Sequence, residues 1–189
     1  MLMEEFQIKV ENVVSNTALG TQIELNKLVA KVDAAEYEPE QFPGLVYRVT
    51  DPKAAALIFS TGKIVCTGTK RIEDSRKALK KVVHKLREVG ILLPNKYTIH
   101  TENIVASTKI DAELKPEEIT FLLENSEYDP EQFPGVIYSI QNPAVTFLIF
   151  RTGKIIVTGG KTIDEIFTAL EILRKKLVSL GINVVPAVD

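Results

Sequence analysis

The residues of this sequence that could do chemistry are phenylalanines, asparagines and lysines that occur twice at the same spacing. Phe42 and Phe59 lie 17 positions apart, and Phe133 and Phe150 repeat that spacing 91 positions later. The sequence shows no nucleophile paired with a base, no glycine-rich phosphate loop before a helix and no cluster of histidines or carboxylates suited to acid–base work. It therefore predicts a binding protein rather than an enzyme, with no cofactor and no metal site.

An internal repeat covers most of the 189-residue chain. Residues 36–70 match residues 127–161 at 20 of 35 positions, with an offset of 91. Two copies are too few for a solenoid, so we expect a pseudo-twofold pair that shares one sheet and one core. The first repeat is predicted as residues 1–95 and the second as residues 96–189, intertwined in one structure.

Each copy contains the same order of predicted elements. A strand, predicted from alternation of apolar and polar residues, is followed by a short helix, then by three short strands between turn signals, and finally by a long amphipathic helix. Because the connections between the strands are short, they imply an antiparallel meander, and the fold class is α+β. The predicted ranges are 6–16, 23–32, 45–50, 55–59, 63–67 and 71–89 in the first copy, and 97–108, 116–125, 136–140, 146–150, 154–158 and 162–180 in the second.

The predicted strands are apolar on both faces. If Ile58, Ile64 and Cys66 pack on the helices, Cys66 is a buried structural thiol, and Leu57 and Val65 face outward with their repeat equivalents. The outward face is then either an interaction surface or is itself buried, under further helices or in a dimer. Four helices are too few to cover both faces of about ten strands, which favours the interaction surface.

The charge is unevenly distributed along a chain whose net charge is −2. Residues 61–96 hold 10 Lys and Arg against 3 Asp and Glu, mostly on the long helix predicted at 71–89. This basic face is either a solvated surface or a contact surface for DNA flanks or a partner protein. No apolar run is long enough to span a membrane and the acidic start lacks the features of a signal peptide, so we expect a cytoplasmic protein without a membrane partner.

The two Phe pairs, the two EQFPG turns, the Asn12-x-Val14 and Asn103-x-Val105 strings and the two TGK-x-x-x-TG strings resemble the TATA-box-binding protein family, in its archaeal form. The resemblance covers about residues 6–182. It implies a saddle-shaped sheet of about ten strands with four helices on the convex side. It further implies a general transcription initiation factor, associated with the nucleoid of an archaeal cell, that binds the minor groove of the A·T-rich TATA box.

The resemblance also implies roles for individual residues. The four phenylalanines would wedge into two base steps and kink the DNA, a behaviour for which this family is an established example. Outward apolar residues would exclude G·C pairs, Asn and Thr side chains would donate to groove acceptors, and other polar side chains would contact phosphates. The implied DNA-binding residues are Asn12, Val14, Phe42, Arg48, Leu57, Phe59, Thr61, Lys63, Val65, Thr67, Asn103, Val105, Phe133, Leu148, Phe150, Thr152, Lys154, Ile156 and Thr158.

The second turn would bind a protein partner. Asp129, Glu131 and Gln132 match the surface on which the family docks transcription factor B, which in turn brings in RNA polymerase. Ser139 departs from the pattern, because many members carry Arg there, so fewer ionic contacts are expected in the second half.

Several alternatives stay open at this point. The asparagines could instead bond to nearby backbone, Lys63 and Lys154 could serve turn solubility, and the free protein could form a homodimer that hides its apolar face. The alternative function is that of a paralogue or accessory module of the same fold, which uses its sheet to bind another protein or nucleic acid.

Overall fold

The computed structural model describes residues 6–187, and these residues form ten strands and four helices. The same series of elements occurs twice, as predicted, and the assigned strand pairs are antiparallel, which confirms the α+β class. The elements are β1 (Lys9–Ala18), α1 (Leu25–Val29), β2 (Ala35–Glu36), β3 (Leu45–Thr50), β4 (Lys53–Ile58), β5 (Lys63–Thr69), α2 (Ile72–Glu88), β6 (His100–Lys109), α3 (Pro116–Leu122), β7 (Ser126–Glu127), β8 (Gly135–Gln141), β9 (Ala144–Phe150), β10 (Lys154–Gly160) and α4 (Ile163–Ser179).

Two compact units make up the chain, and each unit combines segments of both sequence copies. One unit is Asn12–Glu102, with the strand order β2-β3-β4-β5-β1, and the other joins the segment that ends at Glu11 to the chain from Asn103 onward, with the order β6-β10-β9-β8-β7. Strands β1 and β6 each begin in one unit and end in the other. The assignment of residues 1–95 and 96–189 as the two repeats stays a prediction.

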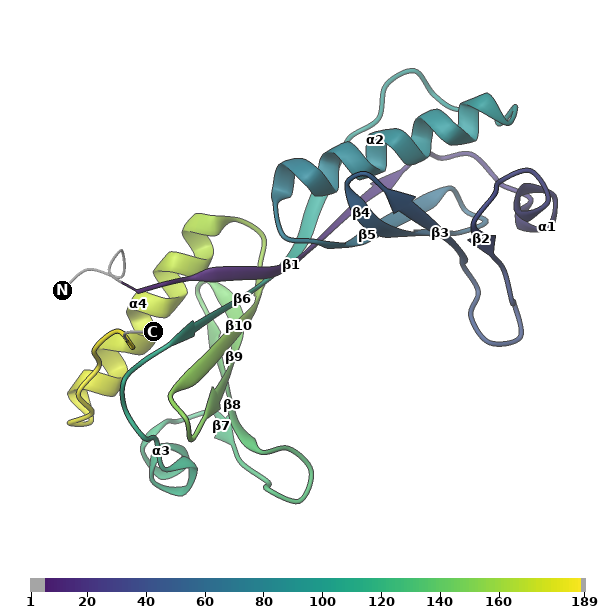
Figure 1. The fold of residues 1–189 in the computed structure, drawn as a ribbon. Coiled ribbons are helices and arrows are strands. Elements are labelled where there is room, and N and C mark those ends of the chain that lie inside the picture. The colour runs from purple at the N-terminus through teal and green to yellow at the C-terminus, as the bar shows by residue number, and fades with distance from the viewer. Residues whose placement is uncertain (1–5, 188–189) are drawn as a thin grey trace. The chain divides into compact units, whose positions relative to one another are not determined.

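Helix α2 covers one face of its half of the sheet. Its buried residues repeat at helical spacing, with Leu79, Val82 and Val83 fully buried against β3, β4 and β5. In Figure 1, α2 lies along these strands, and the loop that joins β2 to β3 extends away from it. Acidic residues in the first turn of α2 and basic residues in its last turn agree with the helix dipole.

Cys66 lies inside this core. Its side chain is fully buried, and burial raises the pKa of the thiol to about 11, with the neighbouring Ser75 hydroxyl opposing the shift. The Ser75 hydroxyl donates its hydrogen to the hydroxyl of Ser15 at 2.8 Å, which joins α2 to β1 through a buried polar pair. The prediction of a buried structural thiol is therefore confirmed.

Several predicted boundaries differ from the structure. The first strand of each copy runs to Ala18 and Lys109, beyond the predicted ends at 16 and 108, because pairing with β5 and β10 extends the strand past the alternating residues. Helix α3 ends at Leu122 rather than at 125, since Leu123 is already extended and Asn125 has a positive φ of 62°. The helix predicted at 23–32 is only Leu25–Val29.

Two strands, β2 and β7, have only two residues each and were not among the predicted ranges. A two-residue strand has no periodicity to detect, and these two are defined by pairing with β3 and β8.

Because the Leu79 side chain is fully buried, we expect its truncation to destabilise the folded protein strongly. Leu79→Ala should lower the free energy of unfolding by about 2–5 kcal/mol, because the transfer of the leucine and the cavity both cost stability. Lys80→Ala, on the exposed side of the same helix, should change it by less than about 0.5 kcal/mol. Urea denaturation followed by circular dichroism measures both variants, and equal losses would contradict this account of the core.

Candidate nucleic-acid interface

The sheet face opposite α2 carries apolar side chains that remain partly open to solvent. Ile58, Ile64 and Cys66 are at most 1% exposed on the helix side, as predicted, whereas Leu57 and Val65 on the other side are only half-buried. The second unit repeats this pattern with Leu148 and Ile156, which are also half-buried. An apolar face that is covered on one side only is a candidate binding surface.

Strand register arranges this face in cross-strand rows. Val46 pairs with Leu57, Leu57 with Val65, and Val65 with Asn16. The second unit has the equivalent row Ile137, Leu148, Ile156 and Ser107. Sequence reasoning missed the outer residues of both rows, Val46 and Ile137, although the 91-residue offset and their place next to a buried residue could have indicated them.

The four phenylalanines form two contacting pairs. The ring centroids of Phe42 and Phe59 are 5.8 Å apart with an edge-to-face geometry, and those of Phe133 and Phe150 are 5.7 Å apart with the same geometry. In each pair one ring comes from the turn before β3 or β8, and the other is Phe59, directly after β4, or Phe150, the last residue of β9. Phe42 is 37% exposed and the other three are half-buried, so the rings lie outside the fully buried core.

A glycine makes each ring pair possible. A β-carbon placed on Gly44 would lie 2.7 Å from Phe42 Cε1 and 3.1 Å from Phe59 Cε1, and on Gly135 it would lie 3.0 Å from Phe133 Cε1. The glycine in each FPG turn therefore lets the turn ring fold back over the backbone onto its partner.

The asparagines are held by a hydrogen-bond arrangement that occurs identically in both units. Gly68 N donates to Asn12 Oδ1 at 2.8 Å, and Asn12 Nδ2 donates to Thr67 Oγ1 at 3.0 Å. Because a backbone N–H can only donate, it fixes Oδ1 toward Gly68 and leaves Nδ2 as the other end of the amide. Asn103, Thr158 and Gly159 form the same contacts at 2.7 and 3.1 Å.

This arrangement bears on the two interpretations that the sequence left open for the asparagines. The side-chain oxygen does bond to nearby backbone, as the first interpretation holds, but Nδ2 has two hydrogens and Thr67 takes one of them. The second N–H remains as a donor on the half-buried face. A strand irregularity between Val13 and Ser15 and the positive φ of Gly68, 94°, accompany this bond between the Gly68 N–H and the amide oxygen.

The predicted phosphate-binding residues lie at the ends and edges of this face. Thr61 and Thr152 lie in exposed turns before β5 and β10, and Lys63 and Lys154 begin those strands with exposed side chains. Arg48 is exposed on β3 and forms a 3.6 Å ion pair with Glu36.

The second unit differs at the position of Arg48. Ser139 pairs with Thr146 across the strands, and their hydroxyls lie 3.0 Å apart, whereas Arg48 pairs with Ala55. The first unit thus has a cation, Arg48, paired across the strands with a small residue. The second unit has two hydrogen-bonded hydroxyls at the equivalent positions.

The acid two residues before each EQFPG string has the same structural role in both turns. Asp129 O accepts from Gln132 N and Phe133 N, and its carboxylate accepts from Glu131 N at 3.1 Å and Gln132 Nε2 at 2.8 Å. In the first turn Glu38 O accepts from the backbone of Gln41 and Phe42. Of the three predicted partner-binding residues, Asp129 and Gln132 therefore stabilise the turn, and Glu131 presents an exposed carboxylate.

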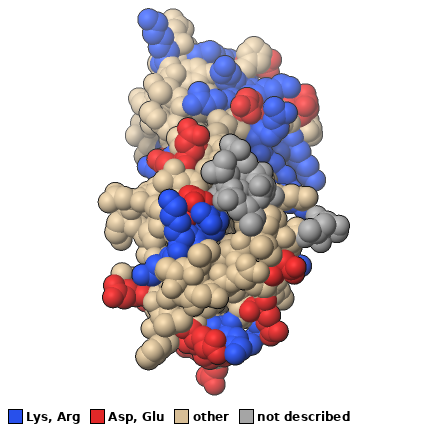
Figure 2. All heavy atoms as spheres, turned by 90° about the vertical axis from the view of Figure 1, so that its left-hand side faces the viewer, with Lys and Arg blue, Asp and Glu red and all other residues tan. Residues whose placement is uncertain are grey.

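The basic segment lies on the outer face of α2. Figure 2 shows Lys and Arg side chains gathered over the part of the surface that α2 forms. Lys81 and Lys77 approach the Asp51 carboxylate at 3.1 and 3.8 Å, and the hydrogen bond from Lys81 with the charge of Lys77 lowers the pKa of that carboxyl.

Among residues 6–187, no group of three or more His, Cys, Asp and Glu side chains is placed to hold a metal ion. No helix in the described part of the chain is long and apolar enough to cross a membrane.

Comparison with known proteins places the chain in a family. The family model described as transcription factor TFIID, or TATA-binding protein, matches residues 7–89 and 98–180. The TATA-box-binding protein of Archaeoglobus fulgidus is 47% identical over 95% of this chain and 100% of its own, and that of Methanosphaera stadtmanae is 45% identical over 94% and 97%. The solved structure of Methanococcus jannaschii TBP covers 91% of this chain and 98% of its own, with 40% identity and a TM-score of 0.81.

The repeated half-sheets, each with one helix-covered face and one open apolar face, define a family of transcription factors rather than of enzymes. The chain belongs to the TATA-box-binding protein family, in the company of its archaeal members. The resemblance inferred from the Phe pairs and the TGK strings, and the fold class expected from it, are confirmed.

Gly44→Ala tests whether the glycine is required by the ring pair. The added β-carbon should displace the Phe42 ring and lower the free energy of unfolding by about 1–3 kcal/mol, as overpacking does. In a Phe42→Ala background most of that loss should disappear, because the nearest clashing atom is gone. Urea denaturation of the wild type, the two single variants and the double variant gives a double-mutant cycle. If Gly44→Ala costs the same stability with and without Phe42, Gly44 acts by another route.

Proposed function

We propose that this protein is a general transcription initiation factor that binds the minor groove of A·T-rich TATA-box DNA with the open face of its sheet and kinks it with paired phenylalanines. The observation that carries the proposal is the occurrence, in both units, of one partly exposed apolar face bordered by a Phe pair and an oriented asparagine amide. The names of the relatives support the choice of ligand.

The chemistry of the minor groove explains why such a face selects A·T pairs. An A·T pair presents only acceptors there, adenine N3 and thymine O2, whereas guanine adds an N2 amine that needs an acceptor. The apolar members of the two rows, Leu57 and Val65 with Leu148 and Ile156, offer no acceptor to that amine, so a G·C pair placed over them leaves a buried donor unsatisfied. Val14 and Val105 extend the same apolar face. The remaining Nδ2–H groups of Asn12 and Asn103 match the acceptors of the A·T pairs.

The phenylalanine pairs supply the wedges. Inserting a ring between base pairs unstacks them at a cost of a few kcal/mol per step, offset by the additional surface that the bent DNA contacts, and TATA-box-binding proteins are themselves among the established examples. An edge-to-face pair presents one ring for insertion and a second that supports it from behind. The glycine-dependent contact of Phe42 with Phe59 holds that geometry before DNA arrives.

Phosphate contacts on either side of the groove would come from Lys63, Lys154, Thr61 and Thr152, with Arg48 in the first unit only. Exchange of the Glu36 carboxylate for a phosphate would leave Arg48 paired with an anion in both states. Ser139 has no charge to offer at the equivalent position, so the two halves of the site should contribute unequally to the salt dependence.

The second turn would bind transcription factor B, which recruits RNA polymerase. Glu131 lies on a turn whose shape Asp129 fixes, and an exposed carboxylate next to DNA suits a basic protein surface better than a phosphate. A nearly symmetrical DNA-binding face gives weak orientation on its own, and a partner at one end supplies it.

The second candidate function is that of a paralogue that uses the same face to bind another nucleic acid or a protein. Such a protein would need the apolar rows but not the phenylalanine wedges. Removal of the wedges separates the two.

Phe42→Ala with Phe133→Ala should weaken binding to a TATA duplex at least about tenfold and abolish most of the bend, because no ring remains to enter the base steps. Fluorescence anisotropy measures the affinity, and resonance energy transfer between labelled duplex ends measures the bend. Phe167→Ala, an exposed phenylalanine on α4, is the control and should change neither. Unchanged binding and bending in the double variant would remove the wedge mechanism and favour the second candidate.

Glu131→Lys should reduce recruitment of transcription factor B to the protein–DNA complex at least about tenfold, because it reverses the charge of the exposed turn. Binding of the TATA duplex alone should not weaken. The matched control is Glu40→Lys at the equivalent place in the first turn, which should leave factor B recruitment intact. A native gel-shift titration measures both, and a larger effect of the control would place the factor on the first turn.

A further inference from the structure

Helix α3 carries an apolar surface that neither the core nor the proposed DNA face uses. Phe121 is 90% exposed and its neighbour Leu122 is 44% exposed, and together with Glu117 and Glu118 they line a shallow hollow on the helix. Single exposed apolar residues are common, but two adjacent large ones with one almost fully in water form a patch that needs an explanation.

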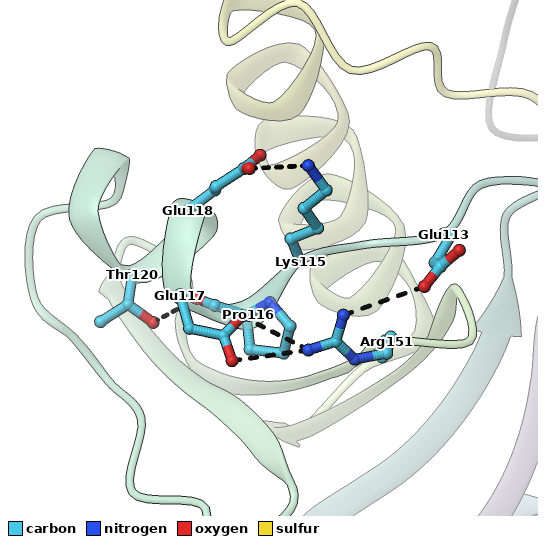
Figure 3. A network of polar contacts seen from close by, with 7 residues as sticks. All are labelled: Glu113, Lys115, Pro116, Glu117, Glu118, Thr120 and Arg151. Carbon is cyan, nitrogen blue, oxygen red and sulfur yellow. Dashed lines mark hydrogen bonds and ion pairs between the residues drawn. The ribbon is translucent and has the colours of Figure 1, made fainter.

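The charged side chains on and beside α3 are mainly acidic. Figure 3 shows Arg151 between Glu113 and Glu117, with Nη1 and Nη2 at 3.8 and 3.4 Å from the two carboxylates, and Lys115 bonded to Glu118 at 2.8 Å. Both cations thus form ion pairs with acids on or beside α3. Residues 113–124, which include α3, hold four acids, and the cations Lys115 and Arg151 pair with three of them. A binding partner must therefore offer an apolar recess with positive charge at its rim.

The first repeat shows that the fold does not require this patch. At the offset of 91, Phe121 and Leu122 correspond to Ala30 and Lys31, and the two glutamates to Asn26 and Lys27. The equivalent surface of the first unit is thus small and basic rather than large, apolar and acidic.

A recess of the required kind exists in the first unit of the same chain. It lies at the end of the β3–β4 hairpin and has a volume of about 440 Å³. Its floor consists of Val49, Ala54, Ala55 and Gly68, and Arg48 and Lys53 lie at its rim with exposed side chains. A small-residue floor with cations at the edge matches an aromatic ring flanked by carboxylates.

The second repeat carries different residues where the first has this recess. The positions of Ala55, Arg48 and Lys53 are occupied by Thr146, Ser139 and Ala144, so the floor is bulkier and the rim has no cation. The projection thus belongs to one repeat and the matching recess to the other.

We propose that a second copy of this chain is the partner: α3 of one molecule docks into the hairpin recess of another, with Phe121 as its anchor and Glu117 and Glu118 against Arg48 and Lys53. The contact is heterologous, since it joins two different surfaces. One aromatic anchor with a small charged rim is less than a standard interface offers, so we expect the association to be weak.

This contact differs from a homodimer that hides the apolar sheet face, because it leaves Leu148 and Ile156 uncovered. It does engage Arg48, which is among the proposed phosphate contacts. Where the proposed function holds, DNA and the second copy therefore compete for the same arginine. The self-association itself does not depend on the proposed function and is tested without DNA.

Sedimentation equilibrium of the full chain from about 1 to 200 µM, at low ionic strength, tests the proposal. We expect concentration-dependent association that weakens with added salt, because part of it is charge attraction at an exposed rim. Phe121→Ala should weaken it at least about tenfold, as loss of a central aromatic anchor does. Phe167→Ala, an exposed phenylalanine on α4 of the same unit, is the matched control and should leave it unchanged.

Charge reversal gives a second, independent readout. Glu117→Lys with Glu118→Lys should abolish association, and so should Arg48→Glu with Lys53→Glu. All four substitutions in one chain should restore it, because each reversed surface then meets its reversed partner. Thermal melting checks that each variant is folded.

Two results would overturn the proposal. One is a monomer over the whole concentration range. The other is association that survives Phe121→Ala but is lost with Ile156→Lys, which would place the contact on the open sheet face instead.

Discussion

A sheet has two faces, and in each unit of this protein the helices cover only one of them. The alternate residues of β4 and β5 are apolar on both sides, yet Ile58 and Ile64 are buried while Leu57 and Val65 stay half-open. Burial of the first set stabilises the fold, and the second set contributes far less because water still reaches it. The surface that we propose to bind DNA is thus the part of the apolar sheet that the helices of the protein do not cover.

Specific contacts hold the asparagines and the phenylalanine rings of this face in place. An asparagine amide is oriented by a backbone N–H from a strand irregularity, and an aromatic ring is admitted by a glycine two residues later. Both devices recur in the second unit with contacts that agree within 0.1 Å for the Asn103 bonds to Gly159 and Thr158. Preorganisation of this kind lowers the ordering cost at the moment of binding.

The repeat also provides an internal control, because equivalent positions share the same backbone surroundings. Where the two units agree, as at the Phe pairs, the fold or the common ligand accounts for the residue. Where the two units carry different residues, neither the shared fold nor a shared ligand explains the difference. Arg76 and Lys81 on α2 correspond to Phe167 and Ile172 on α4, so the outer faces of the two long helices have different chemistry. The differences between α1 and α3 and between the two hairpin ends are of the same kind, and they distinguish one end of the protein from the other.

The sequence by itself determined the repeat, the α+β class, the approximate elements and the two faces of the strands, because these follow from local periodicity and from the identity of aligned segments. It also selected the four phenylalanines and the two asparagines. It did not show that the Asn12 amide would bond to Gly68, 56 residues away, nor that Val46 would join the row of Leu57.

Those features, with the two-residue strands and the division of β1 and β6 between the two units, were decided by the tertiary structure alone. They depend on strand pairing between distant segments, and the bond of Asn12 to Gly68 lies beside an irregularity in the pairing of β1 with β5. Local sequence fixes which way a side chain points along its strand, but only the paired neighbour fixes what that side chain meets.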